Sequence, residues 1–202
     1  MSTVASPATL RATVLPRAGW ATAVALAVAG VAVHTASAQV AVPLPFTPVP
    51  LTLQTLSVLL LAAAYGPRLA TATFASYLAL GMAGAPVFSL GRNGLAVLAT
   101  PSLGYLLGML AATVAVGYLA RRRWDRRPLG TVAMMVVGNA VIYVGGVAWW
   151  LVLGFGPGEA VAGGVVPFLP GDALKIAIAA GVLPGTWALV RRLRDQAGTR
   201  EE

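Results

Sequence analysis

The chain has 202 residues, of which 58% are hydrophobic and only 10% are charged, and its mean hydropathy is +0.81. Soluble domains carry about 25% charged residues, so this chain has too little polar material to cover a globule in water. It has no cysteine, which excludes disulfides and thiolate metal sites, and its single histidine argues against a zinc site. Because the apolar residues gather in long runs, we expect an integral membrane protein.

The net charge of +8 does not indicate a nucleic-acid-binding protein. Thirteen of the fourteen basic residues are arginines, which form short clusters between the apolar runs. Trp124 is the one aromatic residue within these clusters, which is too few for the repeated aromatic platforms on which bases stack. We therefore expect no nucleic-acid partner and interpret the arginines as a signal of membrane topology.

The first 19 residues are polar and rich in small side chains, and we expect them to form a disordered N-terminal segment. The first apolar run extends from Trp20 to Ala38. The basic residues before it and Ala36-Ser37-Ala38 at its end also resemble a signal peptide with its cleavage site. Because the run is long for the core of a signal peptide, we favour a membrane span and keep cleavage as the alternative.

A proline-rich stretch, residues 43–50, follows the first run. Its four prolines lack backbone N–H groups and force extended backbone before them, so it cannot form a regular helix. The second run covers residues 51–65 and the third residues 69–83, joined by a tight turn at 66–68. Both are short for a span of roughly 20 residues, so we expect tilt, extension by flanking residues or shielding by neighbouring helices.

The second half of the chain contains three further apolar runs. A glycine-rich connection leads to the fourth run, an arginine cluster separates the fourth from the fifth, and a Gly/Pro loop precedes the sixth. In chain order these segments are 84–100 (connection), 101–120 (fourth run), 121–127 (arginine cluster), 131–153 (fifth run), 154–170 (loop) and 171–190 (sixth run). Pro184 is expected to kink the last helix.

The arginines decide the topology. With a cytoplasmic N-terminus and six spans, twelve arginines lie in inner segments and one, Arg92, lies outside. This asymmetry is what the positive-inside rule requires, and it arises only for an even number of spans. We therefore predict an all-α, polytopic six-transmembrane-helix bundle over residues 20–192, with a cytoplasmic N-terminus (1–19) and a cytoplasmic tail (193–202).

Asp172 and Lys175 are the ionisable residues expected within the membrane. Charged side chains at membrane depth are costly and commonly functional. The i, i+3 spacing places both on one helix face, and Pro170-Gly171 allows a helix to begin there, so the helix dipole stabilises the Asp172 carboxylate. The alternative is an ion pair that only pins a helix end near the outer interface.

Other polar residues converge on the outer half of the predicted bundle. Thr52 and Gln54 begin the second run, and Asn139 and Tyr143 share one face of the fifth. The remaining residues of this set are Asn93 and Arg92, in the outer loop, and Tyr105, at the start of the fourth run. Each alone fits ordinary helix–helix hydrogen bonding or an interfacial anchor. Together they favour a small-molecule pocket that opens outward.

Small residues also recur on the first run, where Ala21 precedes Ala25 and Ala23 precedes Ala27 by four positions. This spacing permits another helix to approach closely, although an alanine-rich chain produces such pairs by chance. The sequence contains no phosphate-binding loop, no Gly-x-Ser-x-Gly motif and no His–Glu metal motif. Active uptake would therefore need a partner that supplies energy.

Five segments in order resemble the BioY family of biotin transporters and together cover about residues 40–185. They are Pro48-Val49-Pro50-Leu51-Thr52-Leu53-Gln54, Tyr77-Leu78-x-Leu80-Gly81-x-x-Gly84-x-Pro86-Val87-Phe88, Pro101-x-x-Gly104-Tyr105-Leu106-x-Gly108, Gly138-Asn139-x-x-Ile142-Tyr143-x-x-Gly146 and Pro170-Gly171-Asp172-x-x-Lys175. Each segment is weak alone, and the ordered set is specific. One departure is Thr100-Pro101-Ser102-Leu103-Gly104-Tyr105, where the family usually has Gly-Pro-Thr-x-Gly-Tyr.

The resemblance implies a six-helix substrate-binding (S) component of an energy-coupling-factor (ECF) transporter in the bacterial cell membrane. Such a protein captures biotin from outside, lies in membrane lipid and works with a transmembrane coupling protein and two cytoplasmic ATPases, although some members act without dedicated partners. The small residues Ala21, Ala23, Ala25 and Ala27 would face the coupling protein. Biotin is the ligand, and no cofactor, metal or catalytic residue is implied.

The resemblance also assigns roles to the polar residues. Asp172 would accept from the ureido ring of biotin, and Asn139 or Asn93 would complete this recognition. Lys175 would pair with the carboxylate or donate to the ureido oxygen, while Phe88, Tyr105 and Tyr143 would enclose the apolar part. The alternatives are an S component for another vitamin, such as thiamin or riboflavin, an intramembrane enzyme that uses Asp172, and a non-catalytic membrane scaffold.

Overall fold

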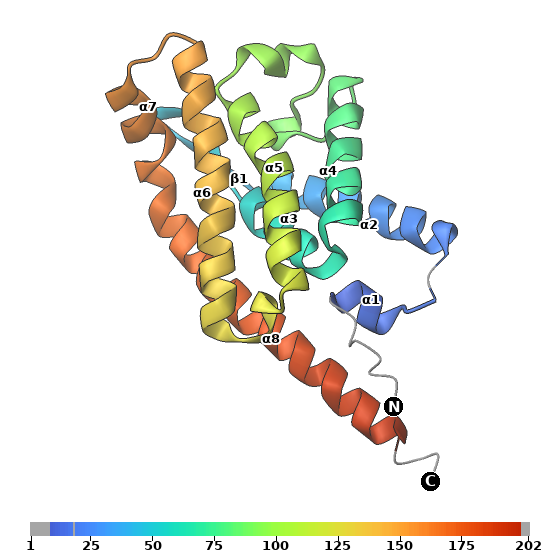
Figure 1. Cartoon of the computed structure of the whole chain (residues 1–202). Helices are drawn as coiled ribbons and strands as arrows, with labels where there is room; N and C mark the ends of the chain where they lie inside the picture. The colour runs from blue at the N-terminus through green and yellow to red at the C-terminus, as the bar shows by residue number, and fades with distance from the viewer. Residues whose placement is uncertain (1–8, 18, 199–202) are drawn as a thin grey trace.

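The computed structural model describes residues 9–17 and 19–198, and Figure 1 shows a bundle of helices with one small hairpin. The six longest helices are α2 (Trp20–Gln39), α3 (Gln54–Tyr65), α4 (Pro67–Met82), α5 (Ser102–Arg121), α6 (Pro128–Val152) and α8 (Leu169–Gly198). The shorter elements are α1 (Leu10–Val14), α7 (Pro157–Gly164), the 3-10 helices η1 (Ser89–Gly91), η2 (Leu95–Ala99), η3 (Trp124–Arg126) and η4 (Val166–Phe168), and the strands β1 (Ala41–Leu44) and β2 (Thr47–Thr52). Each of the six apolar runs therefore contains a helix.

The helices confirm an all-α, polytopic membrane protein. Among the described residues, four helical segments are long and apolar enough to cross a membrane, namely α2, α5, α6 and the stretch 157–196 that contains α8. The helices α3 and α4 have 12 and 16 residues, or roughly 18 and 24 Å at 1.5 Å per residue, against a hydrocarbon core of about 30 Å. The count of six membrane crossings remains a prediction.

Glycines bring α5 and α6 into close contact. A Cβ atom on Gly104 would lie 2.5 Å from the carbonyl oxygen of Gly145, and one on Gly108 would lie 2.6 Å from that of Ile142. No side chain larger than hydrogen fits at these positions, so the two backbones approach directly, as small residues allow in membrane helices. The α5–α6 pair forms a central unit on which α3, α4 and α8 pack.

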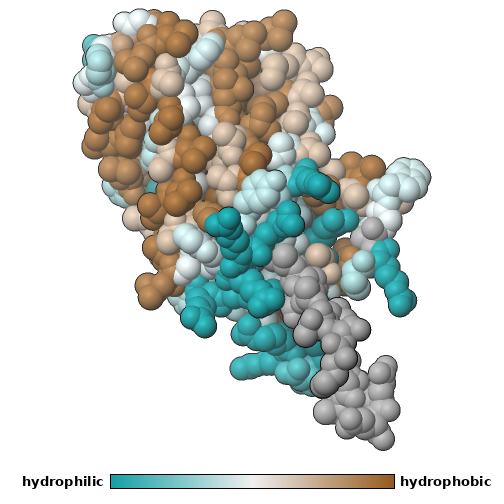
Figure 2. All heavy atoms as spheres, viewed as in Figure 1, coloured by the Kyte–Doolittle hydropathy of each residue, from teal (hydrophilic) through white to brown (hydrophobic). Residues whose placement is uncertain are grey.

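Large apolar side chains also cover the outside of the bundle. Val144, Leu174 and Val152 are 70%, 65% and 69% exposed, and Figure 2 shows the hydrophobic side chains as a broad belt over the helices. In water such a surface would drive aggregation, whereas in a bilayer it faces lipid. Hydrophilic side chains gather at one end, where Figure 1 places α1, η3 and the C-terminal part of α8. The η1–η2 connection and α7 lie at the opposite end.

The expectation of disorder over residues 1–19 is wrong for α1. Thr9 caps this helix by accepting from the N–H of Ala12 (3.4 Å), and Leu10 and Thr13 are buried. The Arg194 guanidinium donates to the Thr13 carbonyl (2.7 Å), which ties α1 to the end of α8. Residues 1–8, which the same expectation covers, lie outside the described residues.

Two connections contain more regular structure than expected. The proline-rich stretch pairs with the residues before it as an antiparallel hairpin, in which Ala41 lies opposite Thr52 and the register is irregular around Pro43, the position that lacks an N–H. The expected loop 154–170 contains α7 and η4, because Pro157 occupies the first helical turn and Glu159 accepts from the N–H of Gly156 (2.9 Å). Finally, α8 continues through Pro184 to Gly198.

Candidate functional site

A cavity lies between the hairpin, the η1 region and the helices α3, α5, α6 and α8. Its lining is mainly apolar with a few polar groups, the usual character of a small-molecule site. The residues that line it are Val49, Pro50, Leu51, Thr52, Gln54, Thr55, Phe88, Ser89, Arg92, Val97, Ser102, Tyr105, Leu106, Met109, Ile142, Tyr143, Phe168, Asp172 and Lys175.

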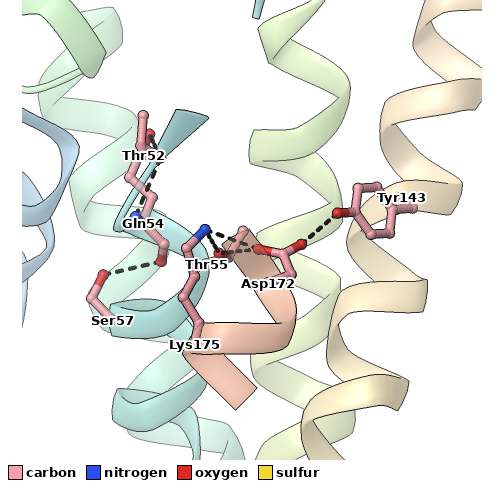
Figure 3. Close-up of polar contacts among 7 residues, drawn as sticks. All are labelled: Thr52, Gln54, Thr55, Ser57, Tyr143, Asp172 and Lys175. Carbon is pink, nitrogen blue, oxygen red and sulfur yellow. Dashed lines mark hydrogen bonds and ion pairs between the residues drawn. The ribbon is translucent and has the colours of Figure 1, made fainter. Parts of the chain in front are cut away.

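The polar centre of the cavity is an ion pair on the first turns of α8. Lys175 Nζ lies 2.9 Å from Asp172 Oδ1, and both residues are buried. Thr55 on α3 accepts from Lys175 (2.9 Å) and donates to the same carboxylate oxygen (3.2 Å), while Tyr143 on α6 donates to the other oxygen. Figure 3 shows these four side chains pointing toward one another from three helices. Burying two charges is costly even when they are paired, which favours a functional reason for the pair.

A second polar group connects the cavity to α2. Thr52 at the end of β2 donates to the side chain of Gln54 at the start of α3 (3.2 Å), and the Gln54 amide donates to the Tyr77 hydroxyl (3.1 Å). The same amide lies 3.4 Å from Nε2 of His34 on α2, whose Nδ1 is 2.8 Å from the Ser57 hydroxyl. This network fixes the orientation of Gln54 in the cavity wall.

Aromatic side chains close the cavity toward the loop end. Phe88 rests directly against Gly81 of α4, where any Cβ atom would overlap the ring. Tyr105 of α5 donates to the carbonyl of Gly164 (2.6 Å), which holds the end of α7, and its ring centroid lies 6.1 Å from that of Phe168. These contacts supply flat apolar walls next to the ion pair.

Seven of the nine residues that the sequence analysis proposed for substrate binding line this cavity. They are Thr52, Gln54, Phe88, Tyr105, Tyr143, Asp172 and Lys175. Asn139 is buried beside an adjoining small cavity that it shares with Thr55 and Lys175, and its Oδ1 atom has no hydrogen-bond partner among the described residues. Asn93 is exposed, donates weakly to the carbonyl of Gly91 (3.4 Å) and does not line the cavity.

Four polar lining residues were not included in that set, namely Thr55, Ser89, Arg92 and Ser102. Thr55 bridges the ion pair, and its signal in the sequence was a hydroxyl one position after Gln54 within an apolar run. Arg92 was noted as a polar loop residue, and only the fold brings it to the cavity. Ser102 has a buried hydroxyl without a hydrogen-bond partner in the described structure.

The residues proposed to contact a partner helix lie on the outer part of α2. Gly30, His34 and Ala38 form its buried stripe, whereas Ala21 and Ala25 are exposed. Ala23 and Ala27 are partly exposed. Ala23 and Ala27 lie on the same side of the helix as the buried stripe, whereas the opposite side, which carries Ala21 and Ala25, is open to a further helix or to lipid.

Together, the apolar outer surface of the bundle and its polar centre define a polytopic membrane protein with an internal cavity of the kind that holds small molecules. Comparison with known families then places the chain more closely. The model of the BioY family matches residues 7–192, and the chain belongs to this family.

Curated relatives and a solved structure agree with this assignment. The biotin transporter BioY of Rhizobium etli is 35% identical over 141 residues, which cover 66% of this chain and 75% of the relative. The biotin transporter BioY of Thermotoga maritima is 36% identical over 140 residues, with coverage of 66% and 78%. The crystal structure of an S-component for biotin from an ECF-type ABC transporter superposes with a TM-score of 0.72, covers 87% of this chain and 92% of that one, and is 23% identical. The last likeness establishes the shared fold.

Proposed function

We propose that this protein is the biotin-binding S component of an ECF-type transporter and that biotin binds in the cavity beside Asp172 and Lys175. The family and the relatives that are named as biotin transporters support this proposal. The observation that carries it is the buried ion pair held by Thr55 and Tyr143 in an otherwise apolar cavity.

The geometry of the pair matches the ureido group of biotin. A ureido ring presents N–H donors and a carbonyl acceptor on neighbouring atoms. Asp172 Oδ1 and Lys175 Nζ are 2.9 Å apart, so a carboxylate acceptor and an ammonium donor face the cavity side by side. We therefore assign both to the ureido end, with Asp172 accepting from N–H and Lys175 donating to the carbonyl. A site with buried partners for both groups rejects ligands that leave them unpaired.

The charge of the cavity suits a carboxylate-bearing ligand. Its charged lining residues are Asp172, Lys175 and Arg92, so one positive charge remains after the ion pair is counted. Arg92 lies in the exposed loop and would pair with the valerate carboxylate, while Phe88 and Tyr105 would contact the apolar thiophane and chain. A cationic vitamin such as thiamin would meet repulsion from the same charges.

The position of the arginines supports an outward-opening cavity. The arginine-rich end would face the cytoplasm by the positive-inside rule, so the cavity side would face outward. The bundle would sit in a bacterial cell membrane. A transmembrane coupling protein would pack on the face of α2 that carries Ala21 and Ala25, and two cytoplasmic ATPases would supply energy.

Equilibrium binding of labelled biotin to purified protein tests the assignment. We expect Asp172→Asn and Lys175→Ala each to weaken binding by about 30- to 150-fold, the equivalent of about 2–3 kcal/mol for a hydrogen bond to a charged group. Glu159→Gln, which changes a carboxylate outside the cavity, serves as the control and should bind like the wild type. Unchanged affinity in both folded variants would contradict the site, and retention of thiamin or riboflavin instead of biotin would contradict the ligand.

Uptake in cells tests the partner face separately. Ala21→Leu with Ala25→Leu should leave biotin binding intact and reduce uptake, because leucine prevents close approach of a second helix. Normal uptake by this variant would argue against a coupling contact on α2. Val24→Leu and Val28→Leu, which alter exposed positions without removing small residues, provide the control.

A further inference from the structure

An arginine-lined groove lies at the end of the bundle opposite the cavity. It is open to the surface and combines cationic with apolar side chains. Its lining residues are Arg123, Trp124, Arg126, Arg127, Pro128, Leu129, Gly130, Ala133 and Arg191. They come from η3, the start of α6 and α8, so the fold assembles the groove from two distant parts of the chain.

The groove has a rigid base. Asp125 is fully buried and accepts from the indole N–H of Trp187 on α8 (2.5 Å), while the Arg126 guanidinium stacks over the same indole ring at 4.1 Å. The carbonyl of Trp124 lies so close to Gly130 that a Cβ atom there would overlap it. Arg123 adopts left-handed backbone with φ of 68°, a strained conformation for a side-chain-bearing residue. These contacts fix the backbone that carries the arginines.

The lining of the groove holds four arginines and no acidic side chain. Its acidic neighbour Asp125 points inward to Trp187. Within the described part of the chain, Arg123, Arg127 and Arg191 form no salt bridge. Burial lowers the pKa of Arg126, and the charges of Arg123 and Arg191 lower it further, while the Asp125 carboxylate opposes this shift. An anion in the groove would offset the positive charge of these arginines.

Apolar surface continues from the groove along α6. Leu129 is 84% exposed and Val136 is 51% exposed. Figure 2 shows that the hydrophilic end directly adjoins the hydrophobic belt. A ligand at this boundary can therefore place a charged group among the arginines and an acyl chain against the helices. A soluble phosphate would use only the first of these features.

We propose that this groove binds the phosphate headgroup of an anionic phospholipid, with its acyl chains along the exposed face of α6. Arginines present planar, multiple N–H donors that match phosphate oxygens. Basic surfaces at the inner membrane boundary are a known basis for recognition of acidic lipids. Bound lipid would neutralise the groove and anchor η3 at the membrane surface.

Native mass spectrometry of the full-length protein with phosphatidylglycerol or phosphatidylcholine of the same acyl chains tests the proposal. We expect preferential retention of phosphatidylglycerol. The triple variant Arg123→Gln, Arg127→Gln and Arg191→Gln should lose about 100-fold in its affinity for this lipid, at roughly fivefold per arginine. The control triple variant Arg68→Gln, Arg122→Gln and Arg192→Gln removes the same charge from exposed positions outside the groove and should retain most of the lipid.

Biotin binding serves as the readout of folding for both triple variants. Equal retention of the two lipids by the wild type would overturn the proposal. Equal loss in both triple variants would show diffuse attraction by net charge and would also overturn it. Displacement of phosphatidylglycerol by millimolar inorganic phosphate would show that the groove recognises a free anion instead.

Discussion

The two ends of the bundle hold their charged residues in opposite ways. At the cavity end, Asp172 and Lys175 are buried and paired, and Thr55 and Tyr143 form further hydrogen bonds with them. At the arginine end, Arg127 and Arg191 are exposed and form no salt bridge with described residues. The first arrangement neutralises charge inside the protein, and the second leaves charge available at the surface.

The difference follows from the surroundings of each end. A charge in the bundle interior meets few polar groups, so its partner must be built into the fold at a cost in desolvation. An arginine beyond the hydrophobic belt is hydrated and can exchange water for an external anion. The cavity end is therefore suited to one small ligand with matched donors and acceptors, whereas the arginine end is suited to a charged surface.

The largest expected effect concerns the packing that positions the cavity walls. Gly104→Leu should destabilise the protein by at least about 3 kcal/mol, because the new side chain meets the backbone of α6, which cannot move aside. Thermal unfolding of the purified protein would measure this loss. Gly181→Ala, at a helical position with no atom within 4 Å of the added Cβ, should be neutral or more stable. Similar behaviour of the two variants would contradict close α5–α6 packing.

Thr55→Val tests whether the Asp172–Lys175 ion pair at the cavity end needs the Thr55 hydroxyl for biotin binding. The variant keeps the shape of the side chain but leaves the Lys175 ammonium and the Asp172 carboxylate without a shared hydroxyl. We expect biotin affinity to fall about tenfold, and Thr55→Ser to restore most of it. Thr186→Val, which removes a hydroxyl bonded only to its own helix, is the control. Wild-type affinity in Thr55→Val would mean that the bridge is not needed for binding.

Ionic strength should separate the two ends directly. Raising the salt concentration from about 0.05 to about 0.5 M shortens the Debye length to a few ångströms. Exposed charges are then screened far more than buried ones. We expect retention of anionic lipid to fall at least about tenfold and biotin affinity to change less than about threefold. Titrations at both salt concentrations would measure this. If the affinities for biotin and for anionic lipid fell equally with salt, the charges at the two ends would not differ in their exposure to solvent as described.

The smallest expected effect concerns Asp125, the carboxyl buried beneath the arginines. Burial raises its pKa above the ordinary value, although the Trp187 hydrogen bond, its own backbone N–H and Arg126 oppose the shift. The folded protein therefore binds this proton more tightly than the unfolded chain, so the stability contribution is full below the ordinary carboxyl pKa and declines as pH rises toward the raised one.

Asp125→Asn should remove this part of the pH dependence. Unfolding midpoints of the wild type and the variant between about pH 4 and 7 would measure it. Glu159→Gln, at an exposed cap, should keep the wild-type slope. Identical slopes in the wild type and Asp125→Asn would show that this carboxyl does not contribute.

Much of the fold could be predicted from sequence because hydropathy is a local property. The apolar runs became helices near their expected bounds, although α3 starts at Gln54 since the residues before it pair in β2. The short helices α1 and α7 were missed because each depends on one capping interaction, at Thr9 and at Glu159. Such caps involve few residues and give no periodic signal.

The candidate site was predicted less completely. Asp172 and Lys175 stood out because charge is rare in apolar runs, and their spacing of three already placed them together. Thr55 is uncharged and does not stand out in its apolar run in this way, and its partners are 117 and 120 residues away in the sequence. Asn93 resembled a site residue by its loop position, yet the loop leaves it exposed outside the cavity.

The sequence alone therefore determined that this is a membrane protein, where its helices lie along the chain and where its arginines cluster between them. Each of these features follows from composition summed along short stretches. Only the tertiary structure decided which polar side chains meet. That outcome depends on how the helices pack. Tyr143, Thr55 and Asp172 meet at one point from three different helices, and glycine contacts hold α5 directly against α6. It also assembled the arginine groove from η3, α6 and α8.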